Sequence, residues 1–125
     1  MNREYRVYDT EQKRYITDER MWFITTDGTL YYLKTENAGF IKADNCVVEH
    51  AVGLPDKNKN QIFEGDIVKS NIFASPRIFV VRYCIAECKF QLKNRNAEYG
   101  ISNVGIPAYE VVGNIHDNSE LLKTA

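Results

Sequence analysis

The sequence predicts a mainly β protein, and three observations lead to that prediction. Eight Tyr, six Phe and one Trp occur among 125 residues, and aromatic side chains favour the pleated, half-buried surfaces of sheets. Short runs of β-branched and aromatic residues recur along the chain between turn-forming residues. No segment shows the long 3.6-residue apolar period of an amphipathic helix. This pattern is typical of a small antiparallel barrel or sandwich.

The chain is expected to begin with two hairpins. Residues 3–8 and 15–16 lie on either side of a polar turn and predict the first. Residues 21–25 and 29–33 are β-prone runs separated by a link that contains Asp27-Gly28. This pair tolerates the positive φ angles of a type I′ turn. The link is therefore the clearest local signal for a hairpin in the chain.

The middle of the chain predicts further strands. Residues 46–52 form a β-prone run that we expect to end at Gly53. Residues 67–73 and 78–85 are strongly β-branched and aromatic, which predicts a hairpin. Residues 87–92 are expected to add the following strand.

The last part of the chain predicts a loop, a strand and a short helix. Residues 93–105 are polar and contain Gly, which indicates a surface loop, and 109–115 return to a β pattern. Residues 117–123 offer Asp or Asn as an N-cap and a Leu pair to dock a short C-terminal helix. We expect one domain over 1–125, with a hairpin-rich N-terminal extension over 1–48 and a barrel over 49–125.

Composition limits the classes of function. Sixteen basic and seventeen acidic side chains give a net charge of −1, so only a local patch is expected to hold nucleic acid. No apolar run is long enough to cross a bilayer or form a signal peptide. The odd number of cysteines, Cys46, Cys84 and Cys88, fits a reducing compartment. We therefore expect a cytoplasmic protein that does not associate with membranes.

Three segments together carry a family resemblance. They are residues 6–9 (RVYD), 52–69 (VGLPDKNKNQIFEGDIVK) and 110–122 (EVVGNIHDNSELL). In this order and spacing they resemble the YopX family of bacteriophage and prophage proteins. That family's pattern opens with Arg-Ala-Trp-Asp, continues through a loop block that ends in Glu-Gly-Asp-Ile-Val, and closes with Val-Ile-Gly-Asn-Ile and a Leu-Leu tail. The resemblance covers nearly the whole chain.

The resemblance implies an SH3-like barrel and an origin in a phage or prophage in a bacterial host cell. It supplies no active-site residues. The chain departs from the family pattern at four positions. Tyr8 stands where Trp is usual, Val52 where Thr is usual, and Pro55 where Lys is usual. Lys59 stands where the loop usually has Gly, which is expected to affect the turn geometry of the loop.

The residues of the central and terminal motifs have a structural explanation. In Glu64-Gly65-Asp66, the glycine permits a backbone conformation that other residues resist, and the aspartate accepts hydrogen bonds from nearby amides. Catalysis by the acid pair would also need a partner group and a cleft, which nothing in the flanking sequence indicates. The predicted structural residues are Gly53, Asp56, Glu64, Gly65, Asp66, Gly113 and Asn114.

Metal sites are the weaker interpretation of the remaining polar residues. Cys84 and Cys88 with His50 and His116 supply a zinc-type ligand set, but the tight Cys-x₂-Cys knuckle is absent. The loop 56–60 contains two lysines and lacks an acidic residue at the twelfth position, so it does not match a calcium loop. We expect no metal, no cofactor and no small-molecule substrate.

Basic residues accompany aromatic ones in the second half of the chain, as they do in barrels that bind single strands. The candidate nucleic-acid contacts are Lys57, Lys59, Lys69, Arg77 and Arg82, with Lys89, Lys93 and Arg95 further along. The alternative is that the aromatic residues belong to the core and the basic residues are ordinary surface charges. The near-zero net charge of the chain favours this alternative.

The sequence thus favours a non-catalytic accessory module that binds a protein partner, a second copy of the chain included, through a sheet edge or loops. A nucleic-acid-binding barrel is the alternative, and an enzyme ranks third.

Overall fold

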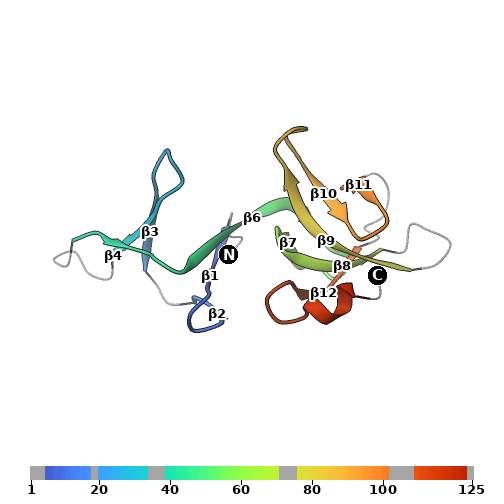
Figure 1. Ribbon diagram of the computed structural model, residues 1–125, viewed down its shortest axis with the longest axis horizontal. Coiled ribbons are helices and arrows are strands. Elements are labelled where there is room, and N and C mark those ends of the chain that lie inside the picture. The colour runs from blue at the N-terminus through green and yellow to red at the C-terminus, as the bar shows by residue number, and fades with distance from the viewer. Residues whose placement is uncertain (1–4, 18–19, 34–38, 71–75, 102–108, 124–125) are drawn as a thin grey trace. The chain divides into compact units, whose positions relative to one another are not determined.

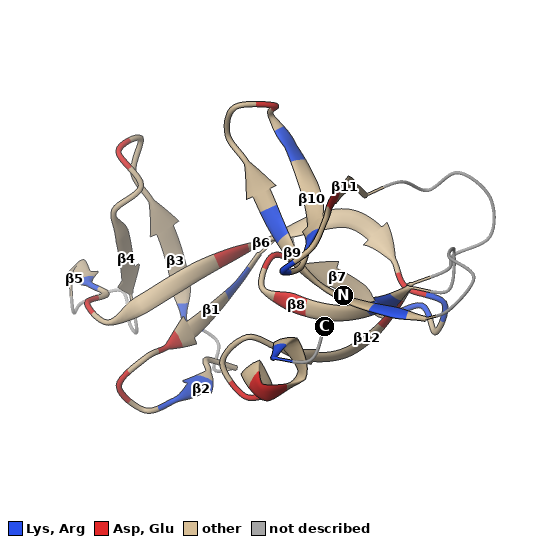
Figure 2. Ribbon diagram, turned by 45° about the vertical axis from the view of Figure 1, so that its right-hand side comes forward, with Lys and Arg blue, Asp and Glu red and all other residues tan. Residues whose placement is uncertain are grey.

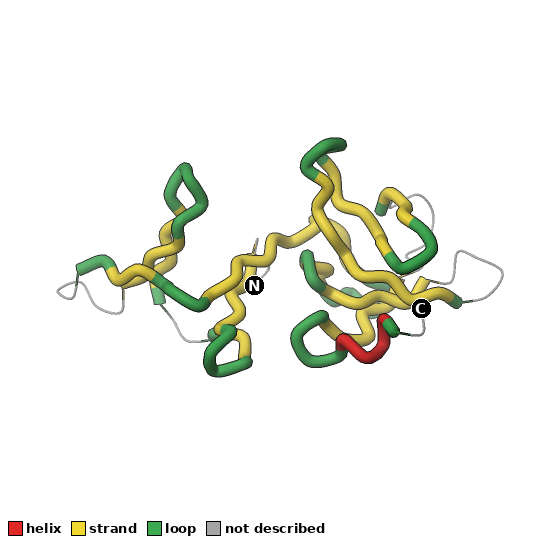
Figure 3. The backbone as a smooth tube through the Cα atoms, in the orientation of Figure 1, coloured by secondary structure: helices red, strands yellow, loops and turns green. Residues whose placement is uncertain are grey.

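The computed structural model describes residues 5–17, 20–33, 39–70, 76–101 and 109–123. The described chain is mainly β, as Figure 1 and Figure 3 show, which confirms the predicted class. It divides into two compact units. The N-terminal unit spans residues 6–48, and the C-terminal unit comprises residues 1–5 and 49–125.

The first strands of the chain form the predicted opening hairpin. Strand β1 (Tyr5–Asp9) pairs antiparallel with β2 (Arg14–Tyr15). The Asp9 carboxylate accepts hydrogen bonds from the amides of Glu11 and Gln12, both at 2.9 Å. The turn between the two strands is therefore closed by a side chain that precedes it, which is the usual role of Asp in a turn.

The N-terminal unit also contains a three-stranded antiparallel sheet in the order β3-β4-β5. Its strands are β3 (Met21–Ile24), β4 (Leu30–Leu33) and β5 (Ile41–Lys42). The β3–β4 hairpin was predicted, whereas β5 was not, because two residues carry no readable period. The segment 34–38 of the predicted looser stretch lies outside the described residues.

The turn between β3 and β4 differs from the predicted type I′ turn. Gly28 has a positive φ of 87°, but Asp27 does not, whereas a type I′ turn needs positive φ at both central residues. The Gly28 amide donates to the Thr25 carbonyl at 2.9 Å, so Gly28 follows the turn as the residue of a bulge. Hydrogen bonds from the Thr25 hydroxyl and from Thr29 lower the pKa of Asp27 to about 2.

Strand β6 (Cys46–Pro55) continues from the N-terminal unit into the C-terminal unit, where it pairs with β7 (Gln61–Phe63). The prediction that this strand ends at Gly53 was wrong. Gly53 adopts a φ of +94°, and the pairing register shifts between Ala51 and Pro55. The glycine therefore forms an irregularity within the strand, which sequence alone does not distinguish from a strand end.

Five strands form the main sheet of the C-terminal unit, in the order β11-β10-β9-β8-β12. They are β8 (Asp66–Ser70), β9 (Arg77–Cys84), β10 (Lys89–Lys93), β11 (Glu98–Gly100) and β12 (Tyr109–Asn114). All neighbours are antiparallel, and the sheet curves into a half-barrel (Figure 1). The presence of β11 corrects the predicted loop over 93–105, of which residues 102–108 lie outside the described part.

One face of this sheet encloses the core. Val68 lies opposite Phe79, and Val81 lies opposite Leu92, so each pair places apolar side chains on the same face. The buried cluster consists of Ile62, Val68, Phe79, Val81, Leu92 and Tyr109. Burial of each large apolar side chain contributes about 1.5–3 kcal/mol, so this cluster is the main source of stability in the unit.

The tail contains one turn of 3₁₀ helix, η1 (Ser119–Leu122), and no α-helix occurs in the described residues. The predicted C-terminal helix is not confirmed beyond this turn. Asn118 occupies the N-cap position of η1, but its side chain makes no capping hydrogen bond. Within the same described ranges, no helix is long and apolar enough to cross a membrane.

Candidate functional site

Asp56 is buried at the start of the loop between β6 and β7, where it organises two segments of the C-terminal unit. Its carboxylate accepts hydrogen bonds from the amides of Asn58 and Asn60 at 2.9 and 2.8 Å, and from that of Val111 at 3.0 Å. Burial opposes ionisation of this carboxyl, but these donors outweigh burial and lower the pKa of Asp56. Asp56 therefore joins the loop to β12, which is a structural role.

Gly65 lies where no side chain fits. It has a φ of +88°, its amide donates to the Val81 carbonyl, and its carbonyl accepts from Ile115, both at 2.9 Å. A Cβ at this position would lie 2.6 Å from Oε2 of Glu49. The glycine of the Glu-Gly-Asp motif is thus required by both its backbone conformation and the carboxylate packed against it.

The buried carboxylate of Glu49 is paired with an imidazole. Oε2 of Glu49 lies 2.8 Å from Nε2 of His116, and the two side chains are 2% and 15% exposed. This pair is not visible in the sequence, because Glu49 lies in a β-prone run and its partner is 67 residues away. The pair packs against Gly65, so the geometry accounts for it as a link between β6 and the turn after β12.

Asn114 and Gly113 build the turn that carries His116. The Asn114 side-chain oxygen accepts hydrogen bonds from the amides of His116 and Asp117 at 2.9 and 3.0 Å. A Cβ on Gly113 would lie 2.5 Å from Oδ1 of Asn118. The Val-Gly-Asn motif therefore shapes the turn that places the imidazole beside Glu49.

Asp66 and Glu64 complete the central motif. Asp66 is buried, and its Oδ2 accepts a hydrogen bond from the Phe63 amide at 2.8 Å. The Glu64 amide donates to the His50 carbonyl at 2.9 Å. These contacts close the short turn from β7 to β8.

The structure does not assemble the metal-ligand set considered from the sequence. Cys46, Cys84 and Cys88 are free thiols. Among the described residues, no group of three or more His, Cys, Asp or Glu side chains is arranged to hold a metal ion. Burial, followed by the nearby Asp9 carboxylate, raises the pKa of the Cys46 thiol, which disfavours the reactive thiolate.

The five predicted nucleic-acid contacts do not share one surface feature. Lys57 forms an ion pair with Glu110 at 3.6 Å, and Lys59 lies in the loop after β6. Lys69 and Arg77 lie on β8 and β9. Lys59 lines a small pocket beside Gln61, and Arg82 lines a different one, together with Lys93 and Arg95. Figure 2 shows basic residues on both β9 and β10.

Exposed apolar side chains concentrate in the N-terminal unit. Met21 is 60% exposed and Phe40 is 64% exposed, and Phe23 and Ile24 are also exposed. Three of these four residues belong to β3, which lies at one edge of the three-stranded sheet. Such a concentration on one edge strand is unusual for a surface without a partner.

Comparison with known proteins gives the family. The family model described as YopX protein matches residues 4–123, almost the entire chain. The chain belongs to the YopX family. No curated protein matches it.

Two solved structures are similar to this YopX-family chain. The crystal structure of protein YopX from Bacillus subtilis is 23% identical, with a TM-score of 0.66, and the match covers 98% of this chain and 99% of that one. A crystal structure of an Enterococcus faecalis protein is 22% identical, with a TM-score of 0.63, and the match covers 95% and 96% of the two chains. At these identities the likeness supports the fold alone.

The family pattern explains one local feature. Lys59, which stands where the family loop usually has Gly, adopts a positive φ of 66°. Its amide donates to the Asp56 carbonyl at 3.0 Å. The loop therefore keeps the left-handed conformation that Gly would adopt, at the cost of local strain of about 1 kcal/mol.

Proposed function

We propose that this protein is a non-catalytic accessory protein, encoded by a phage or prophage and acting in the bacterial cytoplasm, that binds another protein through β3. The occupant of the site is an extended segment of the partner, added as a further strand along the β3 edge. The single observation that carries the proposal is the sequence of this edge strand, Met21-Trp22-Phe23-Ile24, which is apolar throughout and largely exposed.

Within the described residues, β3 lacks three of the features that proteins use to block edge-to-edge association. Charged side chains, proline and bulges are the usual protection. β3 contains no charged residue and no proline, and its pairing with β4 runs without a register shift from Met21 to Ile24. The opposite edge strand, β5, contains Lys42 and is only two residues long. The proposal therefore names β3 and not β5.

Cross-strand pairing places Met21 and Phe23 on one face of the sheet and Ile24 on the other. Met21 and Phe23 lie opposite Leu33 and Tyr31, and Phe23 contacts Phe40 with ring centroids 5.0 Å apart. An added strand would continue this face, so its alternate side chains are expected to be apolar. Lys42, the charged residue in these three strands, lies on the opposite edge strand β5, so β3 itself carries no charge.

The size of the sheet favours an added strand over a stacked second copy. Three strands about 4.8 Å apart, two of four residues and one of two, define a face of roughly 160 Å². A stable interface buries about 800 Å² on each partner. The area that face-to-face stacking would bury is therefore too small for a stable dimer. A strand added at an edge gains main-chain hydrogen bonds as well as side-chain contacts.

We also infer that the C-terminal unit is an SH3-like barrel. The support is its strand order: β8 to β12 are five consecutive strands, the first four form a meander, and the fifth returns to pair with the first. A one-turn 3₁₀ helix follows β12.

The test is affinity capture of the tagged full chain from bacterial lysate after nuclease treatment, with three proteins compared. The first is the unchanged chain, and the second carries Met21→Lys and Phe23→Lys on β3. The matched control carries Ile85→Lys and Val112→Lys, which place the same charges on exposed apolar positions of the C-terminal unit. Emission from Trp22, whose ring lies 5.6 Å from that of Tyr32, reports whether the N-terminal sheet remains folded.

We expect the unchanged chain and the control to recover the same protein. The folded β3 variant is expected to recover at least about tenfold less of it. Equal recovery by all three would refute the proposal, as would no specific recovery by any. Light scattering tests whether a second copy of the chain occupies the β3 edge instead. If the unchanged chain is a dimer and the β3 variant is a monomer, the edge pairs with a second copy, and the assignment to another protein is overturned.

A further inference from the structure

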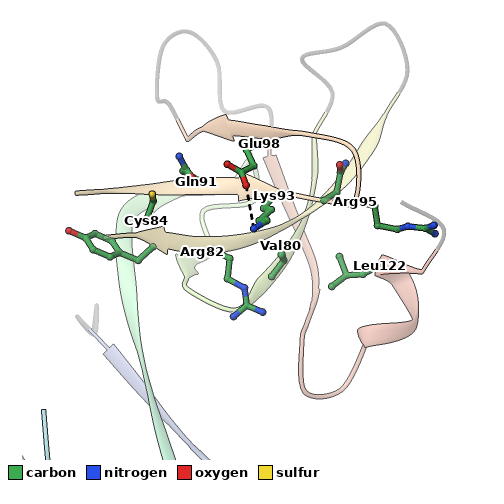
Figure 4. A pocket seen from close by; sticks show the side chains of 10 residues that line it. Val80, Arg82, Cys84, Gln91, Lys93, Arg95, Glu98 and Leu122 are labelled. Carbon is green, nitrogen blue, oxygen red and sulfur yellow. Dashed lines mark ion pairs between the residues drawn. The ribbon is translucent and has the colours of Figure 1, made fainter. Parts of the chain in front are cut away.

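An open groove of about 630 Å³ lies on the C-terminal unit, on the face of β9 and β10 opposite the buried cluster. Val80 and Arg82 line it from β9, and Gln91 and Lys93 line it from β10 (Figure 4). Leu122 of η1 lies at one end. The groove is therefore built from the outer face of the sheet and the tail that follows β12.

Strand register decides which side chains face the groove. Arg82 lies directly opposite Gln91, and directly opposed residues of antiparallel strands point to the same face. Tyr83 and Phe90 form the next row, which points to the other face, so their rings meet on the core side, 5.1 Å apart. Strands β9 and β10, both described in full, thus bring no aromatic ring to the groove. A nucleic-acid base would find no ring of these strands on which to stack.

The groove carries a net positive charge. Its lining contains three basic side chains, Arg82, Lys93 and Arg95, and one carboxylate, Glu98. Lys93 and Glu98 pair with each other at 3.3 Å. The two arginines are therefore the cations that remain for a ligand.

Both arginines have unused donors. Arg82 is exposed and makes no ion pair or hydrogen bond with any described residue. Nη1 of Arg95 donates to the Lys123 carbonyl at 2.9 Å, which holds this side chain beside the tail and leaves its other N–H groups for a ligand. A guanidinium presents two parallel donors that match the two oxygens of a carboxylate. Each arginine can therefore receive one carboxylate.

The exposure of the lining favours a segment of another protein over a small molecule. Pockets for small molecules enclose about 70–90% of the ligand surface. Here the side chains of Lys93 and Glu98 are 54% and 55% exposed, so one side of any occupant stays in water. An extended segment suits such a groove, because its alternate side chains point in opposite directions and only one set needs contacts.

We propose that this groove binds an acidic, extended segment of a partner protein, with one carboxylate on Arg82, a second on Arg95 and an apolar side chain against Val80 and Leu122. Arg82 and Val80 are two residues apart on β9, about 6.8 Å, which is also the spacing of alternate side chains in an extended segment. The segment therefore places its apolar residue two positions from its first acidic residue. The inference does not rest on the proposed docking at β3, which belongs to the other unit.

The test is a titration of the full isotope-labelled chain with the peptide acetyl-Glu-Ser-Leu-Ser-Glu-amide at low salt, followed by NMR. We expect saturable shifts of amide signals in β9 and β10. Arg82→Gln is expected to weaken binding about fivefold, because a partly exposed ion pair is lost. The matched control is Lys59→Gln, which removes one exposed positive charge from the same unit outside the groove and is expected to leave affinity within about twofold.

The choice of ligand is tested by changing the peptide. A version with Gln in place of both Glu residues is expected to bind at least about tenfold more weakly, because it lacks both charges. No saturable shift in β9 and β10 would overturn the proposal, as would equal losses in Arg82→Gln and Lys59→Gln. Glutarate that binds as tightly as the peptide would assign the groove to a small carboxylate. A thymidine trinucleotide, which carries the same two charges, would assign it to nucleic acid if it bound more tightly than the peptide.

Discussion

Replacement of Gly65 by Ala is expected to destabilise the C-terminal unit far more than the same change at Gly53. The two glycines have nearly the same backbone conformation, with φ angles of +88° and +94°. They differ in their surroundings, because a Cβ at Gly53 meets nothing within 4 Å and a Cβ at Gly65 would lie 2.6 Å from Oε2 of Glu49. The comparison therefore separates backbone strain from displacement of the buried carboxylate.

The structure gives the expected magnitudes. A left-handed conformation costs a residue with a Cβ about 1–2 kcal/mol, which applies at both positions. The Glu49 carboxylate is 2% exposed and held by His116 at 2.8 Å, so it has little freedom to move aside. Leaving a buried polar group without its hydrogen-bond partner costs about 1–3 kcal/mol, and more when the group is charged. We expect Gly53→Ala to lower the free energy of unfolding by about 1–2 kcal/mol and Gly65→Ala to lower it by at least about 2 kcal/mol more.

The assay must report the C-terminal unit alone, because Trp22, the single tryptophan, lies in the N-terminal unit. Hydrogen exchange of amides in the core strand β9 measures the free energy of opening in the unit that contains both glycines. Losses that agree within about 0.5 kcal/mol would refute the argument, since they would mean that Glu49 moves aside without cost.

Three further predictions concern the turns of the C-terminal unit. Because the folded-state pKa of Asp56 is lowered from 3.8, its carboxylate stabilises the fold above about pH 4 and loses that contribution as pH falls below 3.8. Asp56→Asn should therefore be less stable than the unchanged chain at pH 7 in urea denaturation followed by circular dichroism, with a difference that shrinks below pH 4; a constant difference would contradict this. Gly113→Ala should lower the free energy of unfolding by about 1–3 kcal/mol, because the new Cβ would clash with the Asn118 side chain. In NMR spectra of isotope-labelled protein, the amide signal of Asn114 should shift. An unchanged melting temperature would contradict the predicted clash. Lys59→Gly should increase the free energy of unfolding by up to about 1 kcal/mol and so raise the melting temperature slightly, because the left-handed strain is relieved. A lower melting temperature would mean that the flexibility of glycine in the unfolded chain outweighs the strain.

The sequence was sufficient for elements with a clear period or turn signal. The hairpin 21–33 and the strands around Phe79 and Tyr109 follow from β-branched and aromatic runs, which pack well on a pleated surface. Two- and three-residue strands such as β5 and β7 were missed because a run that short has no measurable period. Gly53 was taken as a strand end because a glycine at a bulge and one at a terminus look alike in a sequence.

The candidate sites were less predictable because they depend on pairing between distant segments. The Glu49–His116 pair joins residues 67 positions apart, and nothing in either local sequence marks its partner. Arg82 and Lys93 lie on the same face because the β9–β10 register pairs Arg82 with Gln91 and Val80 with Lys93 in adjacent rows of that face. The exposure of Met21 could not be predicted, because the residue type alone does not show whether an apolar side chain is exposed or buried.

The most direct test of the account is amide hydrogen exchange of the full chain with and without the protein recovered by capture. A partner segment added along β3 must form main-chain hydrogen bonds there, so amides of Met21–Ile24 are expected to gain protection that the Met21→Lys and Phe23→Lys variant lacks. Protection confined to the C-terminal unit, with no change in β3, would contradict the proposal that this edge is the docking site.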